Sequence, residues 1–307
     1  MTVHDAIKWA QAELKAGGLL EPLREAQALV AACLGWERAR LIAHPDARLS
    51  AQQVRRLHSW VRRRKQREPL AYITRRAWFY RLELTVGRGA LIPRPETELL
   101  VEVFLGWAGS LPPSVRLPPL REVLPAGRGN LKEGVSCSPI LVDAGTGTGA
   151  VALACLTHTP HWLGVGIDRG RRALRLAQAN RRALGLQSRL MLVQGDWLQG
   201  LQVGSVDAVL SNPPYVLPDE WDVLQPEITR YEPKGALLAP ADDPLRPYRR
   251  IAQGARWALR LGGLLAFETS PRLAPLLAEQ LPVWGFPSPY IVRDYAGDAR
   301  VVWAVRG

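Results

Sequence analysis

Ser211-Asn212-Pro213-Pro214-Tyr215 is the stretch that decides the fold and the site. It follows an apolar run at residues 206–210, which is typical of a buried strand. Two consecutive prolines cannot continue a central strand, because each lacks an N–H for the ladder and has a fixed φ. The chain must therefore leave the sheet at Asn212 in a stiff, extended turn. We expect this turn at a strand's carboxyl end, where ligands bind in open α/β sheets.

The chemistry of this turn suits a planar amino group. The Asn212 side-chain oxygen and the Pro213 backbone carbonyl can accept both N–H bonds of an –NH2 group, and the Tyr215 ring can cover its face. A simple strand-ending turn with a core tyrosine would have the same sequence, because proline pairs are ordinary turn signals. Taken alone, the stretch leaves both interpretations open.

Strand-like and helical patterns alternate around this turn, from residue 140 to the end. We expect strands at residues 140–143, 163–168, 190–193, 206–210, 264–267, 290–292 and 301–305, and helices at 150–156, 174–184, 247–261 and 274–281. This alternation predicts an α/β fold with a doubly wound, mostly parallel sheet of seven strands. A short turn at Gly297-Asp298 divides the last two strands, which suggests an antiparallel hairpin at the sheet edge.

Three strand ends carry residues that suit a nucleoside cofactor. Asp143-Ala144-Gly145-Thr146-Gly147-Thr148-Gly149 follows the first strand, and its glycines let the backbone approach a ligand closely. Its spacing differs from the Gly-x-Gly-x-x-Gly that seats a pyrophosphate. Asp168 ends the second strand, where a carboxylate can bind both ribose hydroxyls, while Asp196 and Trp197 can meet an adenine amine and stack on its ring. This combination favours S-adenosylmethionine over NAD.

Four segments divide the chain. Residues 1–72 predict a helical domain with helices at 3–16, 22–34 and from Ser50 to Lys65. Residues 73–105 predict a hairpin arm and a connecting segment, 106–138 an irregular linker rich in Pro, Gly and Arg, and 139–307 the cofactor-binding domain. The basic run Arg62-Arg63-Arg64-Lys65 could bind phosphates, but a solvated helix face is the more common explanation.

Composition limits the setting and the partner. The net charge of +12 favours an acidic or nucleic-acid-rich partner, so contact with the ribosome or RNA stays open. The three cysteines have no metal-like spacing and leave an odd thiol, which favours a reducing, cytoplasmic setting. No apolar run is long enough to cross a membrane, and no signal pattern precedes the first helix. We expect a monomer without a metal.

The sequence resembles the HemK-type protein-(glutamine-N5) methyltransferases, which modify peptide chain release factors. The resemblance covers most of the chain outside 106–139. The segments that carry it are LIPRPETE at 91–98, DAGTGTGA at 143–150, Gly195-Asp196-Trp197, SNPPY at 211–215, Glu232-Pro233 and the tail at 294–302.

The resemblance implies a class I methyltransferase fold with an N-terminal helical domain that recognises the substrate. It implies that the cofactor S-adenosyl-L-methionine is held by Gly145, Thr146, Gly147, Thr148, Gly149, Asp168, Trp197 and Asn212. It also implies that Asn212, Pro213, Pro214 and Tyr215 bind the substrate glutamine, with Asn212, Pro213 and Tyr215 as the catalytic residues.

Three places depart from the family pattern, one of them the linker at 106–139, which is longer than the family's usual connection. Thr74-Arg75-Arg76 stands where the family has a glycine turn, and the family's Glu-x-Gly-x-x-Gln is represented only by its first residue, Glu268. Nucleic-acid N-methyltransferases that act on DNA adenine or rRNA guanine share a similar Asn-Pro-Pro-Tyr, and the basic charge favours them. A non-catalytic adaptor is a third hypothesis. No basic, aromatic-rich target-recognition domain is evident, and suitable residues occupy every strand end that the chemistry needs.

Overall fold

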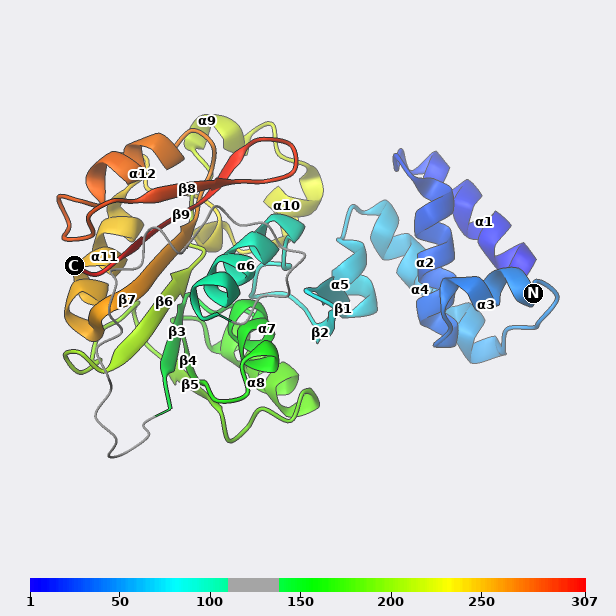
Figure 1. Ribbon diagram of the computed structural model, residues 1–307. Coiled ribbons are helices and arrows are strands. Elements are labelled where there is room, and N and C mark those ends of the chain that lie inside the picture. The colour runs from blue at the N-terminus through cyan, green and yellow to red at the C-terminus, as the bar shows by residue number, and fades with distance from the viewer. Residues whose placement is uncertain (110–137) are drawn as a thin grey trace. The chain divides into compact units, whose positions relative to one another are not determined.

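The computed structural model describes residues 1–109 and 138–307, which form two compact units (Figure 1). The first unit comprises Met1–Arg76, Val86–Arg88 and Leu224–Glu232, and the second comprises Ala77–Thr85, Gly89–Val223 and Pro233–Gly307. The linker predicted at 106–138 lies almost wholly outside the described residues; its first two residues, 106 and 107, end helix α6.

Helices build the first unit around a single apolar core. They are α1 (Val3–Ala16), α2 (Pro22–Leu34), α3 (Arg38–Ala43), α4 (Ala51–Lys65), α5 (Leu70–Thr74) and α10 (Pro226–Tyr231). The three long helices have the predicted bounds, because capping boxes begin α1 at Thr2 and α4 at Ser50, and the left-handed Gly35 ends α2. Leu14, Leu29 and Leu57 are fully buried between these helices.

Sequence patterns did not predict three short helices of this unit. Helices α3 and α5 are too short for a clear apolar period, and α10 comes from a segment far along the chain. Helix α5 ends at Arg75, whose φ of 61° is in the left-handed region. This is where the resembling family has a glycine turn, so an arginine takes a conformation that glycine adopts more readily.

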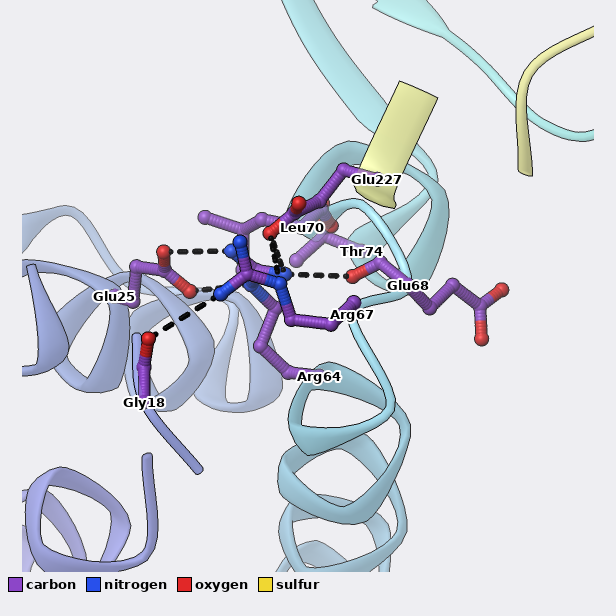
Figure 2. A network of polar contacts seen from close by, with 8 residues as sticks. All are labelled: Gly18, Glu25, Arg64, Arg67, Glu68, Leu70, Thr74 and Glu227. Atoms are coloured by element: carbon purple, nitrogen blue, oxygen red, sulfur yellow. Dashed lines mark hydrogen bonds and ion pairs between the residues drawn. The ribbon is translucent and has the colours of Figure 1, made fainter. Parts of the chain in front are cut away.

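The basic run at the end of α4 is only partly the solvated face that we expected. Arg62 is exposed, but Arg64 is buried within a network of polar contacts (Figure 2). Its guanidinium donates from Nη2 to Glu25 Oε1 at 2.9 Å and from Nη1 to Glu227 Oε1 at 2.8 Å. Arg67 Nε lies 3.0 Å from the same Glu227 oxygen. An ion-pair network therefore attaches α10 to α2 and α4.

A seven-stranded sheet forms the centre of the second unit, within its described residues. Its strands are β3 (Ile140–Ala144), β4 (Leu163–Asp168), β5 (Leu190–Gln194), β6 (Val206–Ser211), β7 (Leu259–Glu268), β8 (Tyr290–Arg293) and β9 (Ala299–Val305). The order is β5-β4-β3-β6-β7-β9-β8, parallel except at β9, which runs antiparallel to both neighbours. This confirms the predicted doubly wound sheet and its antiparallel hairpin.

Helices cover both faces of this sheet (Figure 1). Alternate residues of the strands point to opposite faces, so that Leu141 and Leu210 pack with α6 (Glu98–Trp107) and α7 (Ala150–His158). Val142 and Val209 pack on the other face with α11 (Arg246–Ala258) and α12 (Ala274–Gln280). Helix α8 (Arg171–Ala183) lies beside α7 and β5.

Several boundaries differ from the sequence prediction. The helix expected at 247–261 ends at Ala258, because residues 259–261 already belong to β7, which runs through Gly262 and Gly263. The hairpin arm consists of β1 (Arg76–Phe79) and β2 (Leu82–Thr85). Short helices complete the connections at η1 (Pro95–Thr97), α9 (Pro218–Trp221) and η3 (Lys234–Ala236). No described helix is long and apolar enough to span a bilayer.

Candidate active site

A cavity of about 790 Å³ opens in the second unit at the carboxyl ends of β3, β4 and β6. Most of the residues predicted for the cofactor and substrate line it. They are Gly145, Thr146, Gly147, Thr148, Asp168, Trp197, Asn212 and Pro214. The strand order explains why they meet: β3 is paired with β4 on one side and β6 on the other. The cavity therefore lies at the switch point of the sheet, where ligands bind in this architecture.

Backbone conformation and an aspartate shape the glycine turn. Gly145 and Gly147 have φ values of 81° and 56°, which favour glycine. A Cβ on Gly145 would lie 3.3 Å from the Trp197 ring, tighter than most such contacts. Asp168 Oδ2 accepts from Gly147 N at 2.9 Å, and its Oδ1 accepts from Gly170 N at 2.7 Å. Each oxygen keeps a second lone pair for a ligand hydroxyl.

Gly149 does not line the cavity and has a structural role instead. Its φ is 83°, and it is the N-cap residue of α7. A Cβ there would lie 3.1 Å from Leu153 Cδ1 and 3.3 Å from Ala177 Cβ. The glycine thus allows α7 and α8 to approach each other closely below the turn.

Asp143 is a buried acid beneath the same turn. Its Oδ2 accepts from the Thr146 hydroxyl at 2.7 Å and from Ala152 N at 3.1 Å. Burial raises its pKa to about 6, with the two hydrogen bonds opposing and the Asp168 charge adding to the rise. Asp143 therefore fixes the start of α7 to the end of β3.

Asp196 and Trp197 follow β5 and line the cavity. Trp197 has a φ of 54°, unusual for a residue with a large side chain, and its ring faces Gly145. Asp196 Oδ2 is 2.6 Å from Arg250 Nη2, and both side chains are about half exposed. The acid that we expected to meet an adenine amine is thus paired with an arginine of α11.

Asn212 is held at the end of β6 by its neighbours. Ser211, the last strand residue, donates its hydroxyl to Ala144 O at 2.6 Å and ties β6 to β3 just before the turn. Asn212 Nδ2 donates to Thr97 Oγ1 at 3.3 Å. With Nδ2 committed to Thr97, the Asn212 side-chain oxygen is left for another partner.

Tyr215 and Pro213 lie behind the cavity lining. Pro213 is buried, and Tyr215 packs against the core between the sheet and α11. The Tyr215 hydroxyl donates to Glu268 Oε1 at 3.0 Å. Burial raises the pKa of Tyr215, and the neighbouring Glu268 charge adds to this effect. The tyrosine is therefore a fixed, neutral hydrogen-bond donor.

Glu268 is a fully buried carboxyl at the end of β7. Burial raises its pKa to about 7, while hydrogen bonds from Thr97 and Tyr215 act in the opposite direction. The carboxyl thus stands next to two hydroxyls. The Tyr215 hydroxyl belongs to the Asn-Pro-Pro-Tyr turn, and the Thr97 hydroxyl is the hydrogen-bond partner of Asn212 in the same turn.

The sequence patterns did not single out Thr97, Asp143 and Glu268, which the structure places in or next to the site. Thr97 and Asp143 lie in segments that carry the family resemblance, and Glu268 lies in a segment that departs from it. A single threonine or acid in a sequence does not by itself indicate a functional site. A charged residue at the end of an otherwise apolar strand, as at Asp143 and Glu268, was the available clue, because such groups are rarely buried without a partner. Among the described residues, no group of His, Cys, Asp or Glu could hold a metal ion.

Comparisons with known proteins give the family. Residues 5–74 match the PrmC N-terminal domain, and residues 131–229 match the Methyltransferase small domain. The release factor glutamine methyltransferase of Caulobacter vibrioides is 32% identical over 306 residues, which is 100% of this chain and 97% of that protein. The protein of the same name from Moorella thermoacetica is 33% identical over 307 residues, covering 100% and 99%.

The chain belongs to the release factor glutamine methyltransferase family. The first match covers the N-terminal helices α1 to α5, and the second covers the part of the sheet from β3 to β6. A solved 16S rRNA methyltransferase from T. thermophilus is more distant, with 18% identity and a TM-score of 0.48 over 76% of this chain and 50% of that one.

The cavity of this family member fits S-adenosyl-L-methionine. The close approach at Gly145 and Gly147 leaves room for a ligand, and Asp168 offers acceptors for ribose hydroxyls beside them. The Trp197 indole lies at the same rim, where it can stack on a flat ring. Asn212 lines the same space, so the arrangement can bring a planar amide to a cofactor's methyl group.

Proposed function

We propose that this enzyme transfers a methyl group from S-adenosyl-L-methionine to the side-chain amide nitrogen, N5, of a glutamine in a peptide chain release factor. The observation that carries the proposal is that Asn212 lines the cavity that Asp168 and the glycine turn also line. Family membership over the whole chain supports the substrate class.

The bound cofactor would supply a methyl group on a positively charged sulfur, which is the electrophile. We propose that Gly145, Thr146, Gly147 and Thr148 hold it through the backbone, Asp168 through its ribose, and Trp197 through its adenine. Asp168 needs little reorganisation for this role, because Gly147 and Gly170 already fix its carboxylate. Gly149 supports the turn from below.

The substrate amide nitrogen is a poor nucleophile, because its lone pair is delocalised into the carbonyl. Attack requires the nitrogen to become pyramidal and to develop positive charge. In the proposal, the Asn212 side-chain oxygen and the Pro213 carbonyl accept the two N–H bonds, aim the nitrogen and stabilise the forming charge. Pro214 and Tyr215 keep this pair of acceptors rigid, and the proton leaves to water after transfer.

A nucleic-acid N-methyltransferase is the alternative that the net charge of +12 favours. An exocyclic amine on adenine or guanine would present the same planar –NH2 to Asn212. Family membership favours the protein substrate, and both substrates can be offered to the same preparation.

Labelled S-adenosylmethionine offered separately to a release factor, to DNA and to rRNA tests the function. We expect label on the release factor, at a single glutamine that mass spectrometry locates, and none on either nucleic acid. A Gln→Glu release factor is the matched control and should take no label. Label on DNA or rRNA alone would replace the proposal with the alternative.

We also propose a cytoplasmic location, because release factors act in translation, and a monomeric state. Size-exclusion chromatography with light scattering tests the second point. We further propose that the basic surface contacts the ribosome or RNA. Binding of labelled RNA, measured by titration at increasing salt concentrations, tests this contact.

A further inference from the structure

Glu268 is buried within the site but lies outside the cavity lining, so a direct contact with substrate is not its role. Its Oε1 accepts a hydrogen bond from the Tyr215 hydroxyl at 3.0 Å. The Thr97 hydroxyl is close enough to the same carboxyl to lower its pKa by hydrogen bonding. Thr97 itself lies 3.3 Å from Asn212 Nδ2. One carboxyl thus connects through two hydroxyls to both functional side chains of the Asn-Pro-Pro-Tyr turn.

The direction of these hydrogen bonds follows from the chemistry of an ionised carboxylate, which can only accept. The Thr97 proton is then committed to Glu268, and Thr97 Oγ1 is left as an acceptor for Asn212. Asn212 must therefore present Nδ2 to Thr97, and its side-chain oxygen points away from Thr97. Without a fixed acceptor behind Thr97, the hydroxyl could donate to Asn212 instead, and the amide could flip.

We propose that Glu268 is a positioning residue, which fixes the Asn212 amide through Thr97 and the Tyr215 ring through its hydroxyl. This inference rests on the proposed function, because it assigns the freed Asn212 oxygen to the substrate amide. The ionised form of Glu268 is the form that sets the orientation. Protonation gives the carboxyl a donor and removes the constraint on Thr97.

Charged and titratable groups from four other elements face this carboxyl. They are Glu96 in η1, Tyr215 after β6, Tyr248 in α11 and Arg300 in β9. Glu96 raises the pKa of Glu268 and Arg300 lowers it, but burial has the largest effect and brings it to about 7. The substrate amide does not titrate near this pH, and Tyr215 and Tyr248 have pKa values above their usual range. Asp143, the other buried acid of the site, has a pKa of about 6, so the Glu268→Gln variant decides which of the two carboxyls an ionisation in kcat reports.

The test is single-turnover methylation of a purified release factor between pH 5.5 and 9 by the wild-type enzyme and Glu268→Gln. For the wild type, we expect the rate to rise as Glu268 ionises and to level off above its pKa. The glutamine side chain keeps the size but donates as well as accepts, so Glu268→Gln should lose this rise. Its kcat at high pH should fall about tenfold or more, with KM and cofactor affinity nearly unchanged.

Three further variants separate positioning from packing. Thr97→Val removes the connecting hydroxyl at equal size and should lower kcat as Glu268→Gln does, while Thr97→Ser keeps the hydroxyl and should restore it. Tyr248→Phe is the matched control, because the Tyr248 hydroxyl lies 3.3 Å from the Glu268 backbone oxygen and 3.0 Å from the Thr269 hydroxyl and is not hydrogen-bonded to the carboxyl. It should keep the wild-type pH profile.

The outcomes distinguish the inference from the proposed function. A wild-type enzyme that leaves the release factor unmodified overturns both. A wild-type enzyme that methylates it, together with a Glu268→Gln enzyme of the same kcat and pH profile, overturns only the positioning role. If Glu268→Gln does not fold, the Thr97→Val and Thr97→Ser pair decides, and equal rates for these two contradict the proposal.

Discussion

Asn212 is the residue on which the proposed chemistry depends most. Its Nδ2 donates to Thr97, and Ser211 anchors the preceding strand end to β3. The side chain is thus oriented before any substrate arrives, and such preorganisation is what makes a polar group effective in catalysis.

Asn212→Ala should lower the rate far more than the cofactor affinity. Removing one preorganised hydrogen-bonding group raises the activation free energy by about 3 kcal/mol. Single-turnover methylation gives the rate, and calorimetry with S-adenosylmethionine gives the affinity. A folded Asn212→Ala enzyme that methylates at the wild-type rate would show that the active site is elsewhere.

Asp168→Asn should weaken cofactor binding. The variant keeps the size but loses the charge that strengthens bonds to the ribose hydroxyls, each worth roughly 1.5–3 kcal/mol. Asp207→Asn is the matched control, because Asp207 accepts from Ile140 N and Arg260 and does not line the cavity. Calorimetry compares both with the wild type, and equal affinities would remove Asp168 from the binding site.

Glu268 should make the stability depend on pH. The pKa of Glu268 is about 7 in the folded protein and near 4.5 in the unfolded chain. Its favourable contribution to the free energy of unfolding is therefore fully present below pH 4.5 and is lost as the pH rises through 7. The loss is on the order of 3 kcal/mol. Glu268→Gln should therefore gain stability relative to the wild type between pH 5 and pH 8. Urea unfolding at the two pH values measures this, and a constant difference would contradict it.

At the scale of elements, buried charges connect segments that are distant in sequence. Arg64 of α4 binds Glu25 of α2 and Glu227 of α10 (Figure 2). Burial raises the pKa of Glu227, but hydrogen bonds and charges from Arg64 and Arg67 bring it below its usual value. Glu227 is the buried residue of the short α10, so this network, together with the hydrogen bond from the Tyr231 hydroxyl to Gln66 O, holds α10 in the first unit.

Arg64→Ala should destabilise the first unit by about 3–5 kcal/mol, because it removes the buried partner of Glu25 and leaves Glu227 with Arg67 alone. Arg62→Ala, at an exposed position of the same helix turn, should change stability by no more than about 0.5 kcal/mol. Urea denaturation followed by circular dichroism compares the two. Equal stabilities would mean that Glu25 and Glu227 reach water or another partner when Arg64 is removed.

At the scale of the whole molecule, the cofactor cavity belongs to one of the two units. Every residue that lines it lies in the second unit, while the first has its own core around Leu14, Leu29 and Leu57. Ligand binding should therefore stabilise the units unequally.

S-adenosylmethionine at about 100 times its Kd should raise the unfolding free energy of the second unit by about 2.7 kcal/mol. Hydrogen exchange should slow in β3, β4 and β6 and stay unchanged in the core of α1, α2 and α4. Mass spectrometry of peptides from each unit measures this. Equal protection of both units would show that they unfold together.

The sequence by itself determined the elements and most of the cavity. Strong helical periods and caps gave α1, α2 and α4, and the alternation from residue 140 gave the seven strands of the described sheet. Glycines, Asp168 and the two prolines after Asn212 marked the strand ends, because local backbone geometry requires these residue types there. Elements too short for a period, such as α3 and α5, escaped detection.

Only the tertiary structure decided which residues meet. The pairing of β3 with β6 puts Ala144 opposite Ser211 and thereby brings the glycine turn beside Asn212. The environment of Glu268 comes from Thr97 and Tyr215, which are distant in sequence, and its raised pKa exists only because folding removes the carboxyl from water. In the sequence, Arg64 is one arginine of a basic run, whereas in the structure it is buried at the centre of an ion-pair network. Its burial depends on neighbours that are distant in sequence, so no local pattern predicts it.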